Sequence, residues 1–218
     1  MIKAVIFDLD GVLIQSQELH RLAWNKELER FGLSFTKEEF QHYFGLRGQE
    51  IVRKKFTISG KQAPEDIPTM IFQKNAYFRQ IAENSLEPLP GAKELLQNLK
   101  RQNYKTALGT SAPRENVEFF MKKTGLGKYL DGYACADDVS KGKPEPEVFL
   151  KAAEKIGAKP AECVVIEDAR HGIQAAKKAG MKCIAVATTH PAEDLKQADI
   201  IEKDMSTITV EKIRGLND

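Results

Sequence analysis

The sequence has little of what marks membrane, secreted and nucleic-acid-binding proteins. No apolar run approaches the length that spans a bilayer, and too few apolar residues precede Asp8 for a signal peptide. The formal net charge is only +2, and the basic residues are scattered among acidic ones. The sequence therefore predicts a cytoplasmic protein that has neither a membrane nor a nucleic acid as partner.

Cysteine is scarce as well. Cys135, Cys163 and Cys183 are odd in number and lack the paired spacing of a metal site. Each lies in an apolar context, so we expect small core residues in a reduced chain rather than a disulfide framework. A chain of 218 residues is long enough to bury a substantial core without such crosslinks.

Two patterns of secondary structure follow one another along the chain. Residues 3–7 form an apolar, β-branched run that predicts a buried strand, whereas residues 14–89 show helical patterns and no convincing strand. After Gly91, helices alternate with short strands expected at residues 106–108, 132–136, 163–166 and 183–186. Such alternation is typical of a parallel sheet with helices on both faces.

The fold class expected from these patterns is α/β, with a Rossmann-like parallel sheet. Residues 1–13 and 90–218 would form the catalytic core domain. Residues 14–89 would form an inserted, all-α cap domain, because this helical block lies between one buried strand and the next.

Two carboxylates, Asp8 and Asp10, stand directly after the first predicted strand. A strand that delivers one carboxylate and then turns to present a second is a way to build a nucleophile and its acid/base partner, and Gly11 permits that turn. A plain turn is the alternative, since Asp-x-Asp-Gly is common turn chemistry. A calcium loop is excluded, because its twelfth position, which needs a bidentate glutamate, is Leu19.

Polar groups also follow the later predicted strands. They are Thr110 and Ser111, then Lys143, then Glu167 and Asp168. Ligands bind at the carboxyl ends of strands in an open parallel sheet, so these groups and the two aspartates should meet there. Phosphoryl transfer needs a nucleophile, a divalent cation and donors for the phosphate oxygens. Mg²⁺ prefers oxygens such as those of Asp8 and Asp168.

Each of these groups has a plainer interpretation when taken alone. Lys143 suits a solvated loop charge, Thr110 or Ser111 could cap the helix that follows, and Glu167–Asp168 could lie in a surface loop. Their coincidence at successive strand ends favours a phosphate site over these separate explanations.

Four motifs together resemble those of the haloacid dehalogenase-like hydrolases, in particular the branch of β-phosphoglucomutase and sugar-phosphate phosphatases. The motifs are residues 8–13, 108–111, 142–149 and 166–173. They occur in the family's order with family-like spacing, which is a highly specific signal, and the resemblance covers nearly the whole chain. It implies Asp8 as the nucleophile, which forms an aspartyl-phosphate, and Asp10 as the general acid/base.

The resemblance also implies the ligands of the phosphate and of Mg²⁺. Thr110, Lys143 and the backbone N–H of Ser111 would hold the phosphate. The proposed metal ligands are Asp8, the main-chain carbonyl of Asp10, and Asp168, with Glu167 in support. His20 matches a histidine found at this point in the branch, although helix packing explains it equally well.

Two departures from the branch bear on its mutase activity. Residues 15–17 read Gln-Ser-Gln, so two negative charges that the family commonly carries here are missing. β-Phosphoglucomutase holds a second phosphate with a lysine and an arginine around the cap-loop glycine. When the cap-loop glycine is aligned with Gly45, the positions of that lysine and arginine correspond to Phe44 and Gly48, and Arg47 is the residue before Gly48. We expect Arg47 either to contact the substrate or to be a solvated loop charge.

The function expected from the sequence is therefore a Mg²⁺-dependent phosphatase, monomeric, for a small phosphorylated metabolite such as a sugar phosphate. A β-phosphoglucomutase-like mutase is the alternative enzyme. A non-catalytic module that binds a phosphorylated metabolite is the third hypothesis, and the full set of Asp8, Asp10, Lys143 and Asp168 argues against it.

Overall fold

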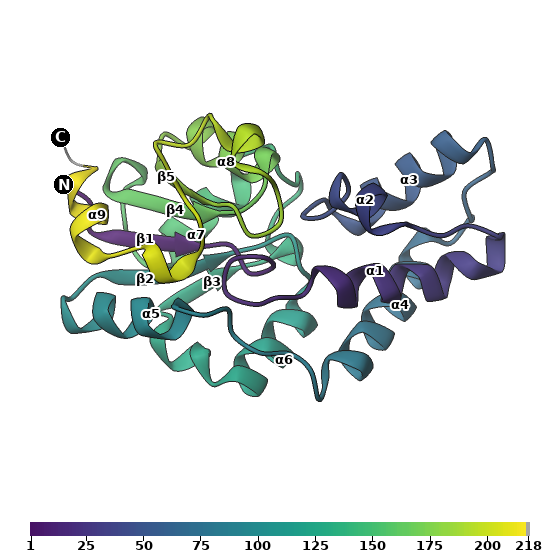
Figure 1. Ribbon diagram of the computed structural model, residues 1–218, viewed down its shortest axis with the longest axis horizontal. Helices are drawn as coiled ribbons and strands as arrows, with labels where there is room; N and C mark the ends of the chain where they lie inside the picture. The colour runs from purple at the N-terminus through teal and green to yellow at the C-terminus, as the bar shows by residue number, and fades with distance from the viewer. Residues whose placement is uncertain (217–218) are drawn as a thin grey trace.

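The computed structural model describes residues 1–216, in which an α/β core lies beside a group of helices (Figure 1). Within these residues, six parallel strands form one sheet in the order β3-β2-β1-β4-β5-β6. The strands are β1 (Ala4–Phe7), β2 (Lys105–Gly109), β3 (Gly132–Ala134), β4 (Cys163–Glu167), β5 (Lys182–Val186) and β6 (Ile200–Glu202). The strand order reverses between β1 and β4, which is where ligands bind in sheets of this kind. The predicted Rossmann-like sheet is confirmed.

The two faces of the sheet are covered by different helices. Because side chains alternate along β1, Val5 and Phe7 pack into one apolar layer, whereas Ala4 and Ile6 pack into the other. The first layer contains α5 (Ala92–Arg101), α6 (Arg114–Thr124) and α9 (Val210–Gly215), and the second contains α7 (Glu147–Lys155) and α8 (Arg170–Lys178). The central strands are thus buried on both sides, as their continuous apolar sequences predict.

The helical group lies between β1 and α5 in the sequence and has its own apolar core. It consists of α1 (Gln17–Leu28), α2 (Lys37–Gln41), α3 (Gly48–Ser59) and α4 (Ile67–Ala82). Trp24, Phe40 and Phe56 are among its buried side chains. The chain leaves the core and returns to it at one place, where the Leu89 N–H donates to the Leu13 carbonyl at 2.9 Å. The domain boundaries at 13/14 and 89/90 stay a prediction.

Short 3₁₀ turns complete the described elements. They are Glu29–Phe31, Leu126–Tyr129, Ala136–Asp138, Pro160–Glu162, Ala192–Leu195 and Met205–Thr207. Strand β6 and helix α9 were not expected from the sequence, because both are short and β6 is only partly buried. The three cysteines are free and buried, as predicted. Among residues 1–216, no helix combines the length and the apolar character that crossing a bilayer requires.

Candidate active site

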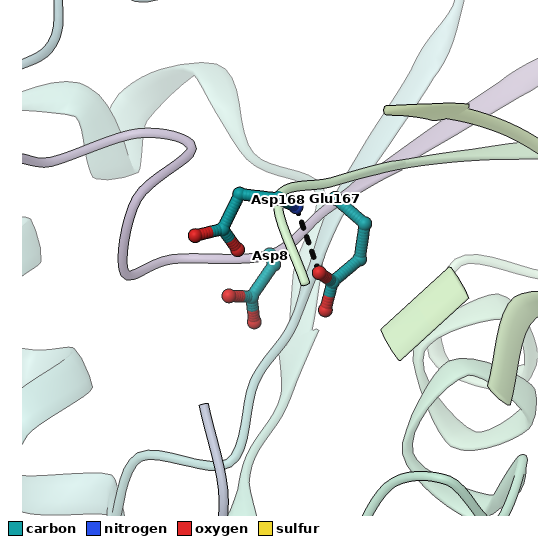
Figure 2. Close-up of side chains that lie close together, drawn as sticks. All are labelled: Asp8, Glu167 and Asp168. Atoms are coloured by element: carbon teal, nitrogen blue, oxygen red, sulfur yellow. Dashed lines mark hydrogen bonds between the residues drawn. The ribbon is translucent and has the colours of Figure 1, made fainter. Parts of the chain in front are cut away.

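Three carboxylates gather where the strand order reverses. Asp8 follows β1, and its N–H donates to the carbonyl of Ile166 at 2.9 Å, which holds it beside the end of β4. Glu167 ends β4 and Asp168 follows it, so all three side chains lie at neighbouring strand ends (Figure 2). One carboxylate oxygen from each lies within 4.8 Å of the others. The sequence prediction that these residues meet is thereby confirmed.

Lys143 is a buried partner of this cluster and not a solvated loop charge, since it is only 3% exposed. Its Nζ donates to Asp8 Oδ1 at 2.8 Å and to Glu167 Oε1 at 2.6 Å. Burial alone would lower the pKa of Lys143, but the charges of Asp8 and Glu167 raise it, so the ammonium form persists. A fixed positive charge therefore stands beside Asp8.

Glu167 is fixed from its other side by the main chain. Its Oε2 accepts the N–H groups of Asp168 at 2.8 Å and Ala169 at 2.7 Å. Burial would raise the pKa of Glu167, but the charges of Lys143 and His171, together with the hydrogen bonds that Glu167 accepts, leave the pKa below its usual value. Glu167 thus orients Lys143 and the Asp168 loop, which agrees with a supporting place in a metal site.

The cluster has more negative than positive charge, and the residues fit a divalent cation. Burial and the neighbouring carboxylates raise the pKa of both Asp8 and Asp168, because one ammonium does not balance three acids. Lys143 contacts Oδ1 of Asp8 and the Thr189 hydroxyl contacts Oδ2 of Asp168, so each carboxylate has a second oxygen for a metal. Buried carboxylate oxygens of this kind suit Mg²⁺.

The Asp10 carboxylate has hydrogen-bond partners of its own, different from those of the three clustered carboxylates. Strand β1 ends at Phe7, and Gly11 adopts φ +83°, a conformation that glycine reaches without strain. The Asp10 carboxylate accepts a hydrogen bond from Ser16 Oγ at 2.5 Å and lies 3.1 Å from His20 Nε2. Burial would raise the pKa of Asp10, but the charge and hydrogen bonds of its neighbours lower it. The two aspartates therefore occupy different electrostatic environments.

His20 joins Asp10 to a buried lysine that the sequence analysis missed. Lys74 of α4 is 4% exposed, its Nζ lies 2.6 Å from His20 Nδ1, and burial lowers its pKa to about 7. His20 also stacks on Phe78 at 4.0 Å, so its packing role and its polar role coexist. Lys74 lies four residues from each of the buried residues Met70 and Phe78, so it belongs to the apolar face of α4. A lysine on the apolar face of a helix is the sequence feature that could have identified it.

The loop after β2 places Thr110 and Ser111 in the same region. Thr110 is 1% exposed, and its hydroxyl accepts the N–H of Ala112 at 3.0 Å. The residue that caps α6 is Pro113, so neither hydroxyl serves as the helix cap considered above. Ser111 lines a cavity of about 610 Å³ together with Asp10 and residues of the helical group. Phosphate contacts by Thr110 and Ser111 stay a prediction.

Thr189 is a second residue that sequence reasoning missed. Its hydroxyl donates to the Asp168 carboxylate, and it lies in the segment after β5. Polar residues after strand ends were the pattern that found the other groups, and the same pattern points to Thr188 and Thr189.

Arg47 lines the cavity from the helical side but reaches across it to the core. Its guanidinium donates to the main-chain carbonyls of Ala136, Val139 and Ser140. It is therefore not a free, solvated charge in this structure. Contact of Arg47 with a substrate stays a prediction.

Comparisons with known proteins agree with the resemblance stated from the motifs. A family model described as haloacid dehalogenase-like hydrolase matches residues 5–186. Validoxylamine A 7'-phosphate phosphatase from Streptomyces hygroscopicus subsp. limoneus is 33% identical over 95% of this chain and 96% of its own. Beta-phosphoglucomutase from Bacillus subtilis (strain 168) is 31% identical over 96% of this chain and 92% of its own.

A solved structure shares the whole fold. The crystal structure of beta-phosphoglucomutase from Clostridium difficile superimposes with a TM-score of 0.89 at 28% identity, covering 99% of this chain and 96% of that one. The match extends over both the sheet and the helical group, since little of either chain is left out.

Proposed function

This chain belongs to the haloacid dehalogenase-like hydrolase family, and from that premise we propose that it is a Mg²⁺-dependent phosphatase for a small phosphorylated metabolite. The observation that carries the proposal is the separation of its two aspartates. Asp8 lies among Lys143, Glu167 and Asp168, whereas Asp10 faces the cavity and His20. One carboxylate is thus placed to attack phosphorus, and the other to handle protons.

The first half-reaction forms an aspartyl-phosphate on Asp8. A carboxylate oxygen of Asp8 bonds to phosphorus while the bond from phosphorus to the ester oxygen breaks. When bound by Asp8 and Asp168, Mg²⁺ supplies positive charge that lets a carboxylate approach the phosphate dianion. Lys143 adds its own charge at Asp8, and Asp10 gives its proton to the departing ester oxygen.

The second half-reaction returns Asp8 to its carboxylate form. The oxygen of a water molecule bonds to the phosphorus of the aspartyl-phosphate while the bond from phosphorus to the Asp8 oxygen breaks, which releases inorganic phosphate, and Asp10 takes the proton from that water. The lowered pKa of Asp10 in the free protein keeps it in the carboxylate form, which is the form that can take a proton. A phosphate dianion near Asp10 raises the pKa of that carboxyl, which favours the protonated form needed in the first half-reaction.

The substrate class follows from the relatives and the cavity. Validoxylamine A 7'-phosphate phosphatase is named for a phosphorylated substrate of small-molecule size, and a cavity of about 610 Å³ accommodates such a compound. We infer a sugar phosphate or a similar phosphomonoester. The similarity to beta-phosphoglucomutase keeps a mutase as the second candidate. Cytoplasmic location and a monomeric state stay predictions.

A phosphate-release screen tests the proposal. Sugar phosphates, polyol phosphates, nucleotides and a small aryl phosphate would be incubated with the protein, with and without Mg²⁺. Asp8→Asn keeps the shape of the side chain but removes the nucleophile and a metal ligand, so turnover should fall to background while the protein stays folded. Activity of this variant above about a tenth of wild type would contradict the assignment of Asp8. A phosphorylated sugar product without free phosphate would favour the mutase.

A further inference from the structure

Arg47 joins the helical group to the core through three hydrogen bonds to main-chain carbonyls. We infer that Arg47 is a positioning residue, a clamp that fixes the loop at residues 44–48 onto the core loop at residues 136–142. The inference rests on the phosphatase function proposed above. It assigns Arg47 to closure of the site and not to binding a second phosphate of the substrate.

The contacts of the guanidinium carry the inference. Nη1 donates to the Ser140 carbonyl at 3.0 Å, and Nη2 donates to the carbonyls of Ala136 at 2.6 Å and Val139 at 2.8 Å. Three of the five N–H donors of an arginine are thereby used by the core. Partners about 90 residues away in the sequence make this a bridge between distant segments.

The near end of the bridge is anchored in a helix. Arg47 occupies the position before α3, and its own carbonyl accepts the N–H groups of Glu50 at 2.9 Å and Ile51 at 3.0 Å. Ile51 is buried in the apolar core of the helical group. A displacement of the Arg47 side chain would therefore be transmitted to the first turn of α3 and to the apolar core of the helical group.

The far end of the bridge lies in the loop that also carries Lys143. The N–H groups of Ser140 and Lys141 donate to Glu147 Oε2 at 3.0 and 2.7 Å, so the core loop is fastened to the start of α7. Lys143 follows two residues later and contacts Asp8. Arg47 thus holds the segment that carries Lys143, and the clamp links closure to the geometry at the nucleophile.

Gly142 packs closely against the side chain of Arg47. A Cβ atom built on Gly142 would lie 2.5 Å from Arg47 Cδ and 2.8 Å from Arg47 Cγ. The φ angle of Gly142 lies outside the left-handed region, so its backbone conformation suits an alanine. The three atoms nearest to that methyl position all belong to the Arg47 side chain, so the added methyl would press on the clamp first.

A double-mutant cycle on Arg47 and Gly142 tests the clamp. Closure excludes water and completes the site for every substrate, so Arg47→Ala should lower kcat/KM equally for a sugar phosphate and for a small aryl phosphate. A loss of up to about 100-fold is expected from a misplacement of about 1 Å. Gly142→Ala should act in the same direction, and the double variant should be no worse than Arg47→Ala alone. Arg53→Ala, an exposed arginine of α3, is the matched control and should leave activity unchanged.

Two kinetic results would overturn the inference. A loss confined to the sugar phosphate would make Arg47 a substrate contact. Losses that multiply in the double variant would show that Gly142→Ala acts on Lys143 independently of Arg47.

Hydrogen exchange provides a measurement that does not depend on activity. In Arg47→Ala and in Gly142→Ala, amide exchange at residues 44–50 and 136–142 should accelerate, whereas Arg53→Ala should resemble wild type. Unchanged exchange in both variants would overturn the clamp. If wild type hydrolysed no phosphate ester, the proposed function would fail, but exchange would still decide on the clamp.

Discussion

Lys74 Nζ lies 2.6 Å from His20 Nδ1, so a buried amine of α4 faces one ring nitrogen of a histidine on α1. The ammonium form of Lys74 has no lone pair and can only donate, so Nδ1 is the acceptor when Lys74 is protonated. The ring proton then resides on Nε2, which lies 3.1 Å from Asp10 Oδ1 and donates to it. Lys74 thereby selects the tautomer of His20 that orients the acid/base carboxylate.

The first prediction concerns this chain of contacts. Lys74→Met keeps an apolar stem of similar length but removes the donor to His20, so Asp10 loses its fixed orientation. We expect kcat to fall by at least about tenfold, which is part of the about 10² to 10⁴-fold that general acid/base catalysis contributes as a whole. Steady-state kinetics on a substrate from the phosphate-release screen would measure the loss.

A second buried lysine provides the control. Lys55 lies in the same helical group and pairs with Glu39 at 2.5 Å, away from Asp10. Lys55→Met should affect stability more than turnover. Equal losses of kcat in the two variants would mean that both act through the fold of the helical group and that the tautomer argument is wrong.

The second prediction is a pH dependence of stability caused by Lys74. Burial lowers its pKa from 10.5 to about 7 in the folded protein. Between these two values the unfolded chain binds the proton and the folded chain does not, so the free energy of unfolding rises with pH. Below pH 7 both states bind it, and the folded state bears the full cost of the buried charge.

Thermal unfolding of wild type and Lys74→Met at several pH values would measure this effect. The Tm of wild type relative to the variant should be lowest at about pH 6 and increase towards about pH 10. The difference between the two proteins isolates Lys74 from the other titrating groups. A Tm difference that is constant over this range would contradict the lowered pKa.

The strand-end residues could be predicted because their positions follow from local patterns. Apolar runs predict the strands, and a parallel sheet brings the carboxyl ends of its strands to one edge. Asp8, Lys143, Glu167 and Asp168 are therefore found from the sequence, and the structure buries all four. The turn at Gly11 was equally predictable, because positive φ there requires glycine.

The contacts between helical group and core could not be predicted in the same way. Lys74 is 54 residues from His20, and the carbonyl partners of Arg47 lie about 90 residues away. Helical periodicity indicates which face of a helix is apolar, but it does not fix how two segments pack against each other. Every residue moreover has a main-chain carbonyl, so the sequence does not indicate which carbonyls accept hydrogen bonds from Arg47.

The third prediction separates the two aspartates by their metal dependence. Asp10→Asn removes the proton carrier but leaves the carboxylates of Asp8, Glu167 and Asp168 in place. We expect turnover to fall by about 10² to 10⁴-fold while Mg²⁺ affinity stays near that of wild type. Isothermal titration with Mg²⁺ would measure the affinity, with Asp8→Asn as the comparison that should lose it. Similar losses of affinity in both variants would show that the Asp10 side chain is itself a ligand.

The fourth prediction concerns how tightly Glu167 is held. Gly172 lies in the first turn of α8, and a Cβ atom there would overlap the Glu167 carboxylate. The backbone of Gly172 is not in the left-handed region, so an alanine would be strained by this overlap alone. Gly172→Ala should therefore push the Glu167 carboxylate away from Lys143 and from the backbone N–H groups that donate to this carboxylate.

Two measurements would follow from that displacement. The free energy of unfolding should fall by about 1 to 3 kcal/mol, as for overpacking in a close-packed interior, even though alanine favours a helix more than glycine does. The affinity for Mg²⁺ and kcat should fall together, because Lys143 and the Asp168 loop lose their support. Gly215→Ala in α9 is the control, since a Cβ atom added there would meet nothing within 4 Å among the described residues. Normal stability and normal kcat in Gly172→Ala would mean that Glu167 can move aside without consequence, and its supporting role would be wrong.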